Sequence, residues 1–203
     1  MSEQTLKIDF TTYAQCKLAC LHFHYAKAVP ASKLIKFGVW ENNVFKGCVV
    51  FGGGANKFIS SPYGLQTGEV CELVRVALRQ HDNPVTKIVS ICLKLLKKHY
   101  PKLKLVISYA DENQGHVGGI YKAGNWIYTG EFANERGIMF LGKLKHRRTI
   151  NQRYGSSKIE YLKTIDPNVS VLKGKSKHKY IYPLDSSIKK DLLSLSRTFP
   201  MRL

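Results

Sequence analysis

The sequence predicts an α/β protein with a mixed, partly parallel sheet flanked by helices. Strand and helix patterns alternate through the middle of the chain with short connections, which favours a sheet that contains parallel strands. In residues 85–100 the apolar side chains gather on one helical face and the lysines lie largely off it, so this segment is expected to cover a sheet. Hydrophobic residues make up 44% of the 203 residues and charged residues 23%, which is ordinary for a globular chain.

Each element has a local signal. Apolar patterning predicts strands over 5–10, 34–40, 44–52, 70–78, 103–109, 126–128 and 137–144. Helical spacing of apolar residues predicts helices over 13–25, 85–100 and 113–123. The turn Glu41-Asn42-Asn43 connects two of the strands, and Pro101 ends the second helix.

The character of the chain changes after Lys145. From Gly142 onward there are 15 of the 32 basic residues but only 4 of the 14 acidic ones. We therefore expect a core over 1–145 and a basic C-terminal extension over 146–203. This extension still contains apolar residues that must be covered, so we expect it to pack on the core, with a helix near 158–164, an edge strand near 180–183 and a closing helix near 188–195.

The charge balance points to a polyanionic partner. The formal net charge is +18 and the sequence pI is about 9.8. Nucleic acid is the commonest polyanion that such a domain meets, although a merely solubilising surface is the alternative. The predicted nucleic-acid contacts are Arg147, Arg148, Lys175, Lys177 and Lys179.

Several other classes are excluded or disfavoured. No apolar run reaches the roughly 18 residues of a membrane-spanning helix, and the N-terminus lacks the basic and apolar regions of a signal peptide. We expect a cytoplasmic protein. The sequence contains no P-loop, dinucleotide-binding fingerprint or nucleophile elbow. Cys16 and Cys20 share a helix face and can act as metal ligands, but without a second pair at finger spacing we favour buried reduced thiols.

Four candidate site residues are unusual in their local context. Asp111 leaves a strand and enters a helix, where it can move a proton, bind a metal or simply cap the helix. Tyr121 lies in a Gly-flanked stretch, where core packing is the simpler explanation. Arg75 interrupts an apolar strand, so it either meets a phosphate, a substrate or a carboxylate such as Asp111, or lies on an exposed face. His24, at the end of the first helix, is weak evidence for a metal by itself.

The order of elements resembles the GNAT acetyltransferase superfamily and, more narrowly, the Mom family of phage DNA-modification proteins. The resemblance is carried by His24-Tyr25, the strand ELVRVAL (72–78), the stretch SYADENQGHVGGIYKAGNWIYTGE (108–131) and the late segment KHKYIYPLD (177–185). It implies that residues 1–145 form a GNAT-like catalytic core in a phage-encoded protein of the host cytoplasm.

The resemblance implies an enzyme that converts adenine in double-stranded DNA to its carbamoylmethyl form at the exocyclic amine, which protects phage DNA from host restriction enzymes. The candidate catalytic residues are His24, Tyr25, Arg75, Asp111 and Tyr121. Such an enzyme must flip the adenine out of the helix, and Tyr121, Trp126 or Tyr128 can stack on the extruded base.

The cofactor expected for the family is acetyl-coenzyme A. The loop that should hold its pyrophosphate, residues 79–87, contains no glycine, so Thr86, Lys87 and Ser90 near a helix N-terminus are the predicted anion contacts. Carbamoylmethylation bonds nitrogen to carbon without forming an amide and needs more than an acetyltransferase base. A redox-active metal such as iron, held by His24, Tyr25, Asp111 and Tyr121, fits that requirement.

Two alternatives share these features. One is an acetyltransferase of a protein, an RNA or a small amine on the same fold. The other is a basic DNA-binding protein on an inactive scaffold. A mass change in DNA adenine distinguishes the adenine-modifying enzyme from both of these alternatives.

Overall fold

The computed structural model describes residues 5–53, 58–132 and 135–199. They fall into two compact units, the first formed by residues 1–109, 118–130 and 179–203 and the second by residues 110–117 and 131–178, each as far as it is described. This division differs from the boundary expected after residue 145, and the predicted extension stays a prediction.

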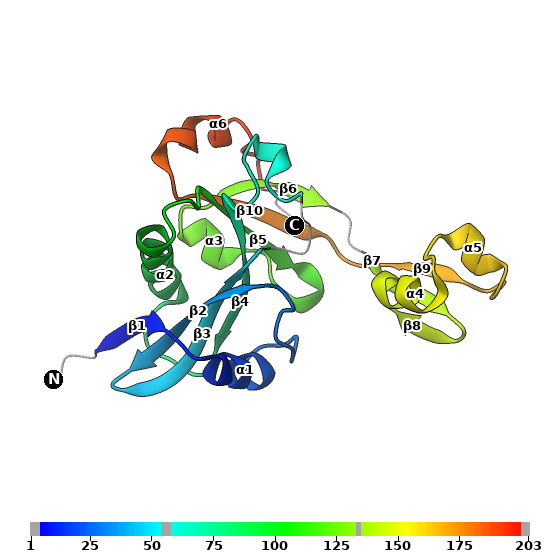
Figure 1. The fold of residues 1–203 in the computed structure, drawn as a ribbon, viewed down its shortest axis with the longest axis horizontal. Coiled ribbons are helices and arrows are strands. Elements are labelled where there is room, and N and C mark those ends of the chain that lie inside the picture. Colours follow the sequence, from blue (N-terminus) through cyan, green and yellow to red (C-terminus); the bar gives the residue numbers. More distant parts are fainter. Residues whose placement is uncertain (1–4, 54–57, 133–134, 200–203) are drawn as a thin grey trace. The chain divides into compact units, whose positions relative to one another are not determined.

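A seven-stranded sheet organises the first unit (Figure 1). Its strands are β1 (Leu6–Phe10), β2 (Leu34–Glu41), β3 (Val44–Gly52), β4 (Val70–Leu78), β5 (Leu105–Asp111), β6 (Ile127–Phe132) and β10 (Lys177–Pro183). Their spatial order is β1-β2-β3-β4-β5-β10-β6. Strands β1 to β4 are antiparallel neighbours, whereas β4 and β5 are parallel, which confirms the predicted mixed sheet.

Helices cover both faces of this sheet. They are α1 (Tyr13–His22), α2 (Val85–His99), α3 (Gly119–Ala123) and α6 (Lys189–Leu193), with 3₁₀ turns η1 (Ser61–Tyr63) and η3 (Ser186–Ile188). Cys48 and Val50 of β3 pack on α1. Phe51 points to the opposite face, because side chains alternate along a strand. On that face a chain of ring contacts leads from Phe51 through Phe37 and Phe10 to His99 of α2.

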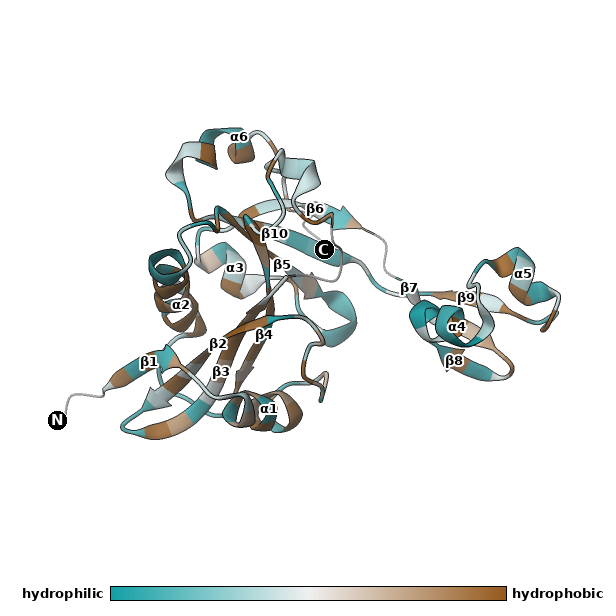
Figure 2. Ribbon diagram, viewed as in Figure 1, coloured by the Kyte–Doolittle hydropathy of each residue, from teal (hydrophilic) through white to brown (hydrophobic). Residues whose placement is uncertain are grey.

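Local sequence explains where the two long helices begin. Thr12 and Gln15 form a capping box at the start of α1, in which the Thr12 side chain accepts from the Gln15 backbone N–H. Helix α2 follows Pro84 and buries Ile88, Val89, Cys92, Leu93 and Leu96. This confirms the predicted amphipathic pattern, in which one helical face is apolar and the lysines lie largely off it. Figure 2 shows the hydrophobic colouring of β3 to β5 that these helices cover.

The second unit has its own small core. It contains the three-stranded sheet β8-β7-β9, built from β7 (Glu135–Phe140), β8 (Lys143–Lys145) and β9 (Ser170–Lys173). It also contains η2 (Glu112–Gln114), α4 (Arg147–Tyr154) and α5 (Ile159–Lys163). Five buried residues form its core: Ile138, Phe140, Ile150, Leu162 and Val169. Helix α4 and strand β9 were not predicted, because charged residues obscure their few apolar positions.

Three sequence-based expectations need correction. The single strand expected over 137–144 is two antiparallel strands, β7 and β8, because Leu141 and Gly142 form a turn with positive φ between them. The segment near 180–183 is not an edge strand, because β10 lies between β5 and β6. Pro183 is tolerated there because it is the last residue of the strand. The single helix expected over 113–123 is two short pieces, η2 and α3, separated by glycines in the left-handed conformation at Gly115 and Gly118. Among the described residues, no helix is both long and apolar enough to cross a membrane.

Candidate active site

Strand β4 carries a β-bulge beside Arg75. Val50 of β3 pairs with Arg75 and Phe51 pairs with Leu73, so Val74 is the extra residue. The Arg75 Nη1 donates to the Val74 carbonyl at 2.7 Å. Its Nε is buried and, within the described chain, has no hydrogen-bond partner. Arg75 is half-buried, so it does not lie on a solvated face, and no described carboxylate forms an ion pair with it.

The pairing between the parallel strands β4 and β5 ends next to this bulge. Their register runs from Val70 with Leu105 to Leu73 with Ser108, although both strands continue beyond it. Ser108, which is fully buried, places its hydroxyl 3.0 Å from the Leu73 carbonyl and 2.7 Å from the Tyr121 hydroxyl. One hydroxyl hydrogen cannot serve both partners, so when Ser108 donates to Leu73, Tyr121 is the donor to Ser108.

Tyr121 is held rigidly among aromatic rings. Its ring stacks on Tyr180 with centroids 4.9 Å apart and meets Trp126 edge-on at 5.1 Å. Burial raises the pKa of Tyr121 to about 12, even though the Ser108 hydroxyl lowers it. Tyr121 therefore keeps its proton at neutral pH and acts as a hydrogen-bond donor. Gly118 makes this packing possible, because a Cβ there would overlap the Tyr180 ring.

His24 and Tyr25 follow α1 and lie together. Their ring centroids are 4.1 Å apart, and the His24 Nδ1 accepts the Ala26 backbone N–H at 3.1 Å. His24 is buried, whereas Tyr25 is 50% exposed. Tyr25 also contributes to the raised pKa of Tyr121, which places the two hydroxyls in one electrostatic environment.

Asp111 belongs to the second unit and caps the turn η2 there, which agrees with the capping role considered for it from the sequence. One of its carboxylate oxygens accepts the backbone and side-chain N–H groups of Asn113, both at 2.9 Å. The other lies 3.4 Å from the Lys177 Nζ. The geometry thus shows a structural role for Asp111, and its catalytic role stays a prediction.

Sequence reasoning missed the buried pair Glu112 and His178. His178 is completely buried, and its Nε2 lies 2.6 Å from a Glu112 carboxylate oxygen. The other ring nitrogen lies 4.0 Å from Glu131. A histidine within the alternation Lys177-His178-Lys179-Tyr180 was the available signal, since alternate residues of a strand face the interior.

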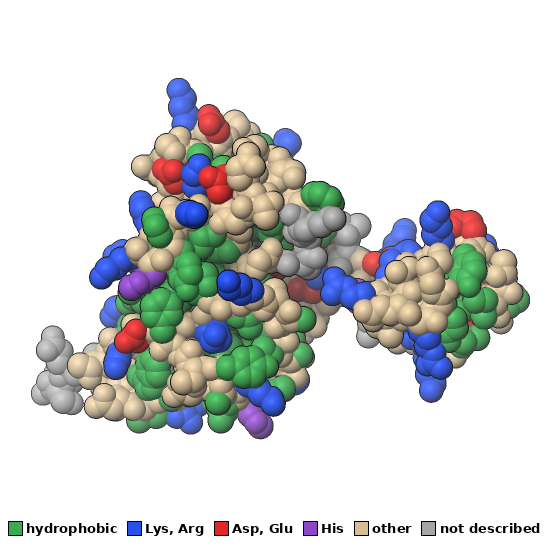
Figure 3. Space-filling view, viewed as in Figure 1, with side chains coloured by type: hydrophobic (Ala, Val, Ile, Leu, Met, Phe, Trp, Pro, Cys, Tyr) green, Lys and Arg blue, Asp and Glu red, His purple; other side chains and the backbone are tan. Residues whose placement is uncertain are grey.

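The predicted nucleic-acid contacts have different surroundings. Arg148 and Lys175 are exposed. Arg147 instead forms a 2.7 Å ion pair with Glu135, and Lys177 pairs with Asp111 as above. Lys179 of the first unit is half-buried over the Tyr63 ring, and burial lowers its pKa. On the face that Figure 3 shows, basic side chains are spread out and do not merge into one patch.

The loop before α2 uses its amide groups internally. The buried carboxylate of Glu41 accepts the backbone N–H groups of Asp82 and Asn83 at 2.9 and 2.8 Å, and the Asn83 side chain at 2.8 Å. Lys87 donates to the Asn83 side chain. The amides of Asp82 and Asn83 are therefore engaged by the protein and are not offered to a pyrophosphate.

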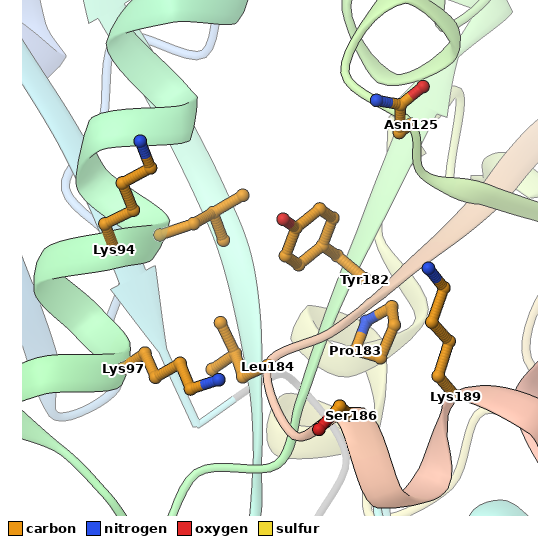
Figure 4. A pocket seen from close by; sticks show the side chains of 9 residues that line it. Lys94, Lys97, Asn125, Tyr182, Pro183, Leu184, Ser186 and Lys189 are labelled. Carbon is orange, nitrogen blue, oxygen red and sulfur yellow. The ribbon is translucent and has the colours of Figure 1, made fainter.

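Two cavities lie beside α2 and share Leu93 and Tyr182 in their lining, and we call the pair the groove along α2. Thr86 and Ser90 line the smaller cavity, of about 20 Å³, together with Ile120 and Trp126. The larger cavity, of about 450 Å³ (Figure 4), has Lys94, Lys97, Asn125, Ser186 and Lys189 in its polar lining. Asn125 has a left-handed backbone with a φ of 59°. Three amines around an apolar floor suit a ligand with both apolar and phosphate parts.

Comparisons with known proteins agree on one family. A model of the Mom protein family matches residues 5–201. The chain is 27% identical over 177 residues to the methylcarbamoylase Mom of Escherichia phage Mu, and this match covers 83% of the chain and 71% of that protein.

Solved structures share the fold at low sequence identity. A probable acetyltransferase from Staphylococcus epidermidis has a TM-score of 0.50 at 7% identity, covering 88% of this chain and 99% of that one. The spermidine/spermine N-acetyltransferase from Vibrio cholerae has a TM-score of 0.50 at 8% identity, covering 91% and 96%. The predicted acetyltransferase-like fold is confirmed.

Proposed function

Because the chain belongs to the Mom protein family, we propose that it is a transferase that adds a carbamoylmethyl group to the exocyclic amine of adenine in DNA. This modification protects phage DNA from host restriction enzymes. The structural observation that best supports the proposal is the opening between β4 and β5, flanked by Arg75, Ser108 and Tyr121. Ligands of α/β sheets usually bind where neighbouring strands diverge in this way.

The side chains at this opening suit transfer to an amine. The Tyr121 hydroxyl donates its hydrogen to Ser108, so its oxygen can accept a hydrogen bond from the adenine amine, and the Arg75 guanidinium attracts a carbonyl or phosphate oxygen of the donor. The adenine nitrogen loses one proton when it bonds to carbon. Glu72 is a candidate acceptor of that proton, because its charge raises the pKa values of both Tyr109 and Tyr121 and its side chain is half-buried beside them.

The aromatic residue for the flipped base is better assigned to Tyr25 than to the residues first considered. Tyr121, Trp126 and Tyr128 are only 7–8% exposed. Tyr121 contacts the rings of Trp126 and Tyr180, and Tyr128 also contacts Tyr180, so these buried rings have little surface left for a base. Tyr25 is half exposed and shares the environment of Tyr121. Stacking on an aromatic side chain compensates the base for the stacking that it loses in the duplex.

Acetyl-coenzyme A fits the groove along α2 only in part. The apolar floor and the lysines of the larger cavity suit its pantetheine arm and phosphates, with Thr86 and Ser90 at the inner end. The preceding loop offers no glycine and its amides are engaged by Glu41. An acetyl group also lacks the amide nitrogen of the product, and its methyl carbon would have to lose two electrons to bond to the adenine nitrogen. A nitrogen-containing reactant and a two-electron oxidant would therefore both be required beside it.

The described structure does not support iron at the predicted ligands. The Nδ1 of His24 accepts a backbone N–H, and Tyr121 keeps its proton and bonds to Ser108. Both Asp111 oxygens are engaged by Asn113 and Lys177. We therefore assign no step of the reaction to iron.

The proposal is tested by mass spectrometry of nucleosides from plasmid DNA of cells that express the protein. We expect deoxyadenosine heavier by one C₂H₃NO unit with the wild type. Arg75→Met should abolish it, while Asp191→Asn, which changes an exposed carboxylate of α6, should leave it unchanged. Asp111→Asn keeps an acceptor for Asn113 and tests the charge alone. Unmodified nucleosides from well-expressed wild type would refute the proposal, and acetylated protein or RNA would favour the acetyltransferase alternative.

Cofactor binding is tested separately by titrating coenzyme A calorimetrically. Lys94→Ala and Lys189→Ala should each weaken binding about tenfold, because each removes a charge-assisted contact. Lys98→Ala and Lys190→Ala are matched controls, since they lie on the same helices but do not line the cavity. Equal losses in variants and controls would exclude this groove.

A further inference from the structure

The core beneath α1 brings three cysteine thiols together. Cys16 and Cys20 lie one helical turn apart in α1, and Cys48 faces them from β3. All three are completely buried, and their sulfur atoms lie within 4.8 Å of one another. Sequence spacing showed only the first pair, because the third ligand comes from a strand 28 residues further along.

We propose that Cys16, Cys20 and Cys48 form a binding site for one thiophilic metal ion, and that its geometry suits copper(I). Three sulfurs at about 2.3 Å from a central ion lie roughly 4 Å apart. The three sulfurs of this cluster lie within 4.8 Å of one another, so small side-chain movements suffice to bind one ion. Thiolate ligands select soft ions such as copper(I) over the harder ions that carboxylates bind.

The number of ligands favours copper(I) over zinc. Structural zinc takes four ligands in a tetrahedron. Within the described part of the chain, no fourth Cys, His, Asp or Glu joins this group. The same core cluster contains Ala19, Val50 and Ala77, which supply no ligand atom. A three-coordinate ion is thus the better match.

Neighbouring positive charge makes a thiolate site tolerable in this core. The Cys48 thiol donates to the Cys16 carbonyl at 4.0 Å, and the charge of the Arg75 guanidinium lowers the pKa of Cys20. One copper(I) ion with three thiolates carries two negative charges, which the Arg75 guanidinium offsets in part. The remaining thiol protons pass to solvent when the ion binds.

The other cysteines provide an internal comparison. Cys71 and Cys92 are equally buried, and burial raises the pKa of each to about 12. Within the described residues neither belongs to a group of metal-ligand side chains. If the arrangement of the three thiols creates the site, metal binding should depend on Cys16, Cys20 and Cys48 and not on Cys71 or Cys92.

The experiment is an anaerobic titration with copper(I), and with cadmium(II) as a spectroscopic probe of thiolate ligation. It is done on the folded protein and on protein refolded with the ion present, so that slow access to a buried site is not mistaken for lack of binding. We expect one ion per chain, a sulfur-to-cadmium charge-transfer band and, with free ion 100-fold above Kd, a Tm higher by roughly 5–10 °C.

Cys48→Ser and Cys20→Ser should lose the ion and the charge-transfer band, whereas Cys92→Ser and Cys71→Ser should keep both. Circular dichroism establishes whether each variant is folded. If Cys48→Ser does not fold, Cys48→Ala replaces it in the metal-binding experiment. No bound ion in either wild-type preparation, or an ion retained by folded Cys48→Ser, would overturn the proposal.

Discussion

Glu41, the last residue of β2, accepts both the backbone and the side-chain N–H of Asn83 at 2.8 Å each, although the two residues lie 42 positions apart. This carboxylate is 3% exposed and ties the loop before α2 to the far side of the sheet. It occupies amides that a glycine-rich loop would offer to a pyrophosphate. The departure of this loop from the usual acetyltransferase pattern therefore has a structural cause.

Glu41→Gln should destabilise the first unit by about 1–3 kcal/mol, because neutral amide oxygens accept these hydrogen bonds more weakly and the added NH₂ group faces other donors. Chemical denaturation measures the change. Glu69→Gln is the control, since Glu69 pairs with the partly exposed Lys104 and should cost less than 1 kcal/mol. Equal losses of unfolding free energy in the two variants would show that the Glu41 hydrogen bonds stabilise the protein no more than the Glu69 ion pair does.

The lowered pKa of Glu41 predicts that the protein loses stability in acid. Burial raises the pKa of Glu41, but the hydrogen bonds from Asn83 and Asp82 and the nearby Lys46 outweigh it and lower the pKa to about 2 from 4.5. A group with a lowered folded-state pKa stabilises the protein above its unfolded-state value and loses this contribution as the pH falls toward the folded value. The unfolding free energy of wild type should therefore drop between about pH 4.5 and pH 2, and that drop should be smaller in Glu41→Gln.

Gly118→Ala and Gly119→Ala should have opposite effects. Gly118 has a φ of 84°, and a Cβ there would overlap the buried Tyr180 ring, so the expected cost is roughly 2–4 kcal/mol. At Gly119 a Cβ meets nothing within 4 Å, and alanine should stabilise by about 0.4–1 kcal/mol. Thermal unfolding distinguishes them; a harmless Gly118→Ala would mean that Tyr180 can move.

Tyr121→Phe should reduce the fraction of modified deoxyadenosine about 100-fold after a fixed induction time, because it removes the hydroxyl that positions the adenine amine. Ser108→Ala should reduce it by about tenfold, since it only loosens the position of that hydroxyl. Tyr161→Phe changes an exposed tyrosine of α5 and should have no effect. If Tyr121→Phe retains full activity, this hydroxyl takes no part in the reaction.

Sequence patterning located most elements of the first unit because apolar residues recur in its strands and in α2 with the spacing of those elements. The limits of α1 were less well predicted: Phe23 and the residues after it leave the helix, and no glycine or proline marks that end. In the second unit, α4 fully buries only Ile150 and half-buries Tyr154 against the same core, and a single pair four residues apart is too little to establish a helical period.

The candidate site was predictable where a residue was unusual in its own segment. Arg75 stood out within an apolar strand, and Tyr121 stood out among glycines. Contacts between distant segments left no such mark. The pairing of Glu112 with His178 spans 66 positions, and Cys48 reaches α1 from 28 positions beyond Cys20. A pairing that arises only when strands meet cannot be found from spacing along one chain.

The position of β10 has a consequence for biosynthesis. This strand fills the place between β5 and β6, yet it is translated after the whole second unit. Until residue 183 leaves the ribosome, β5 and β6 each expose an unpaired edge, and such edges recruit other chains. At 5–20 residues per second the interval lasts several seconds, longer than local hairpins and helices need to form. Synthesis rate and chaperone supply, as well as stability, should therefore govern the yield of native protein, and chains truncated before β10 should accumulate as aggregates.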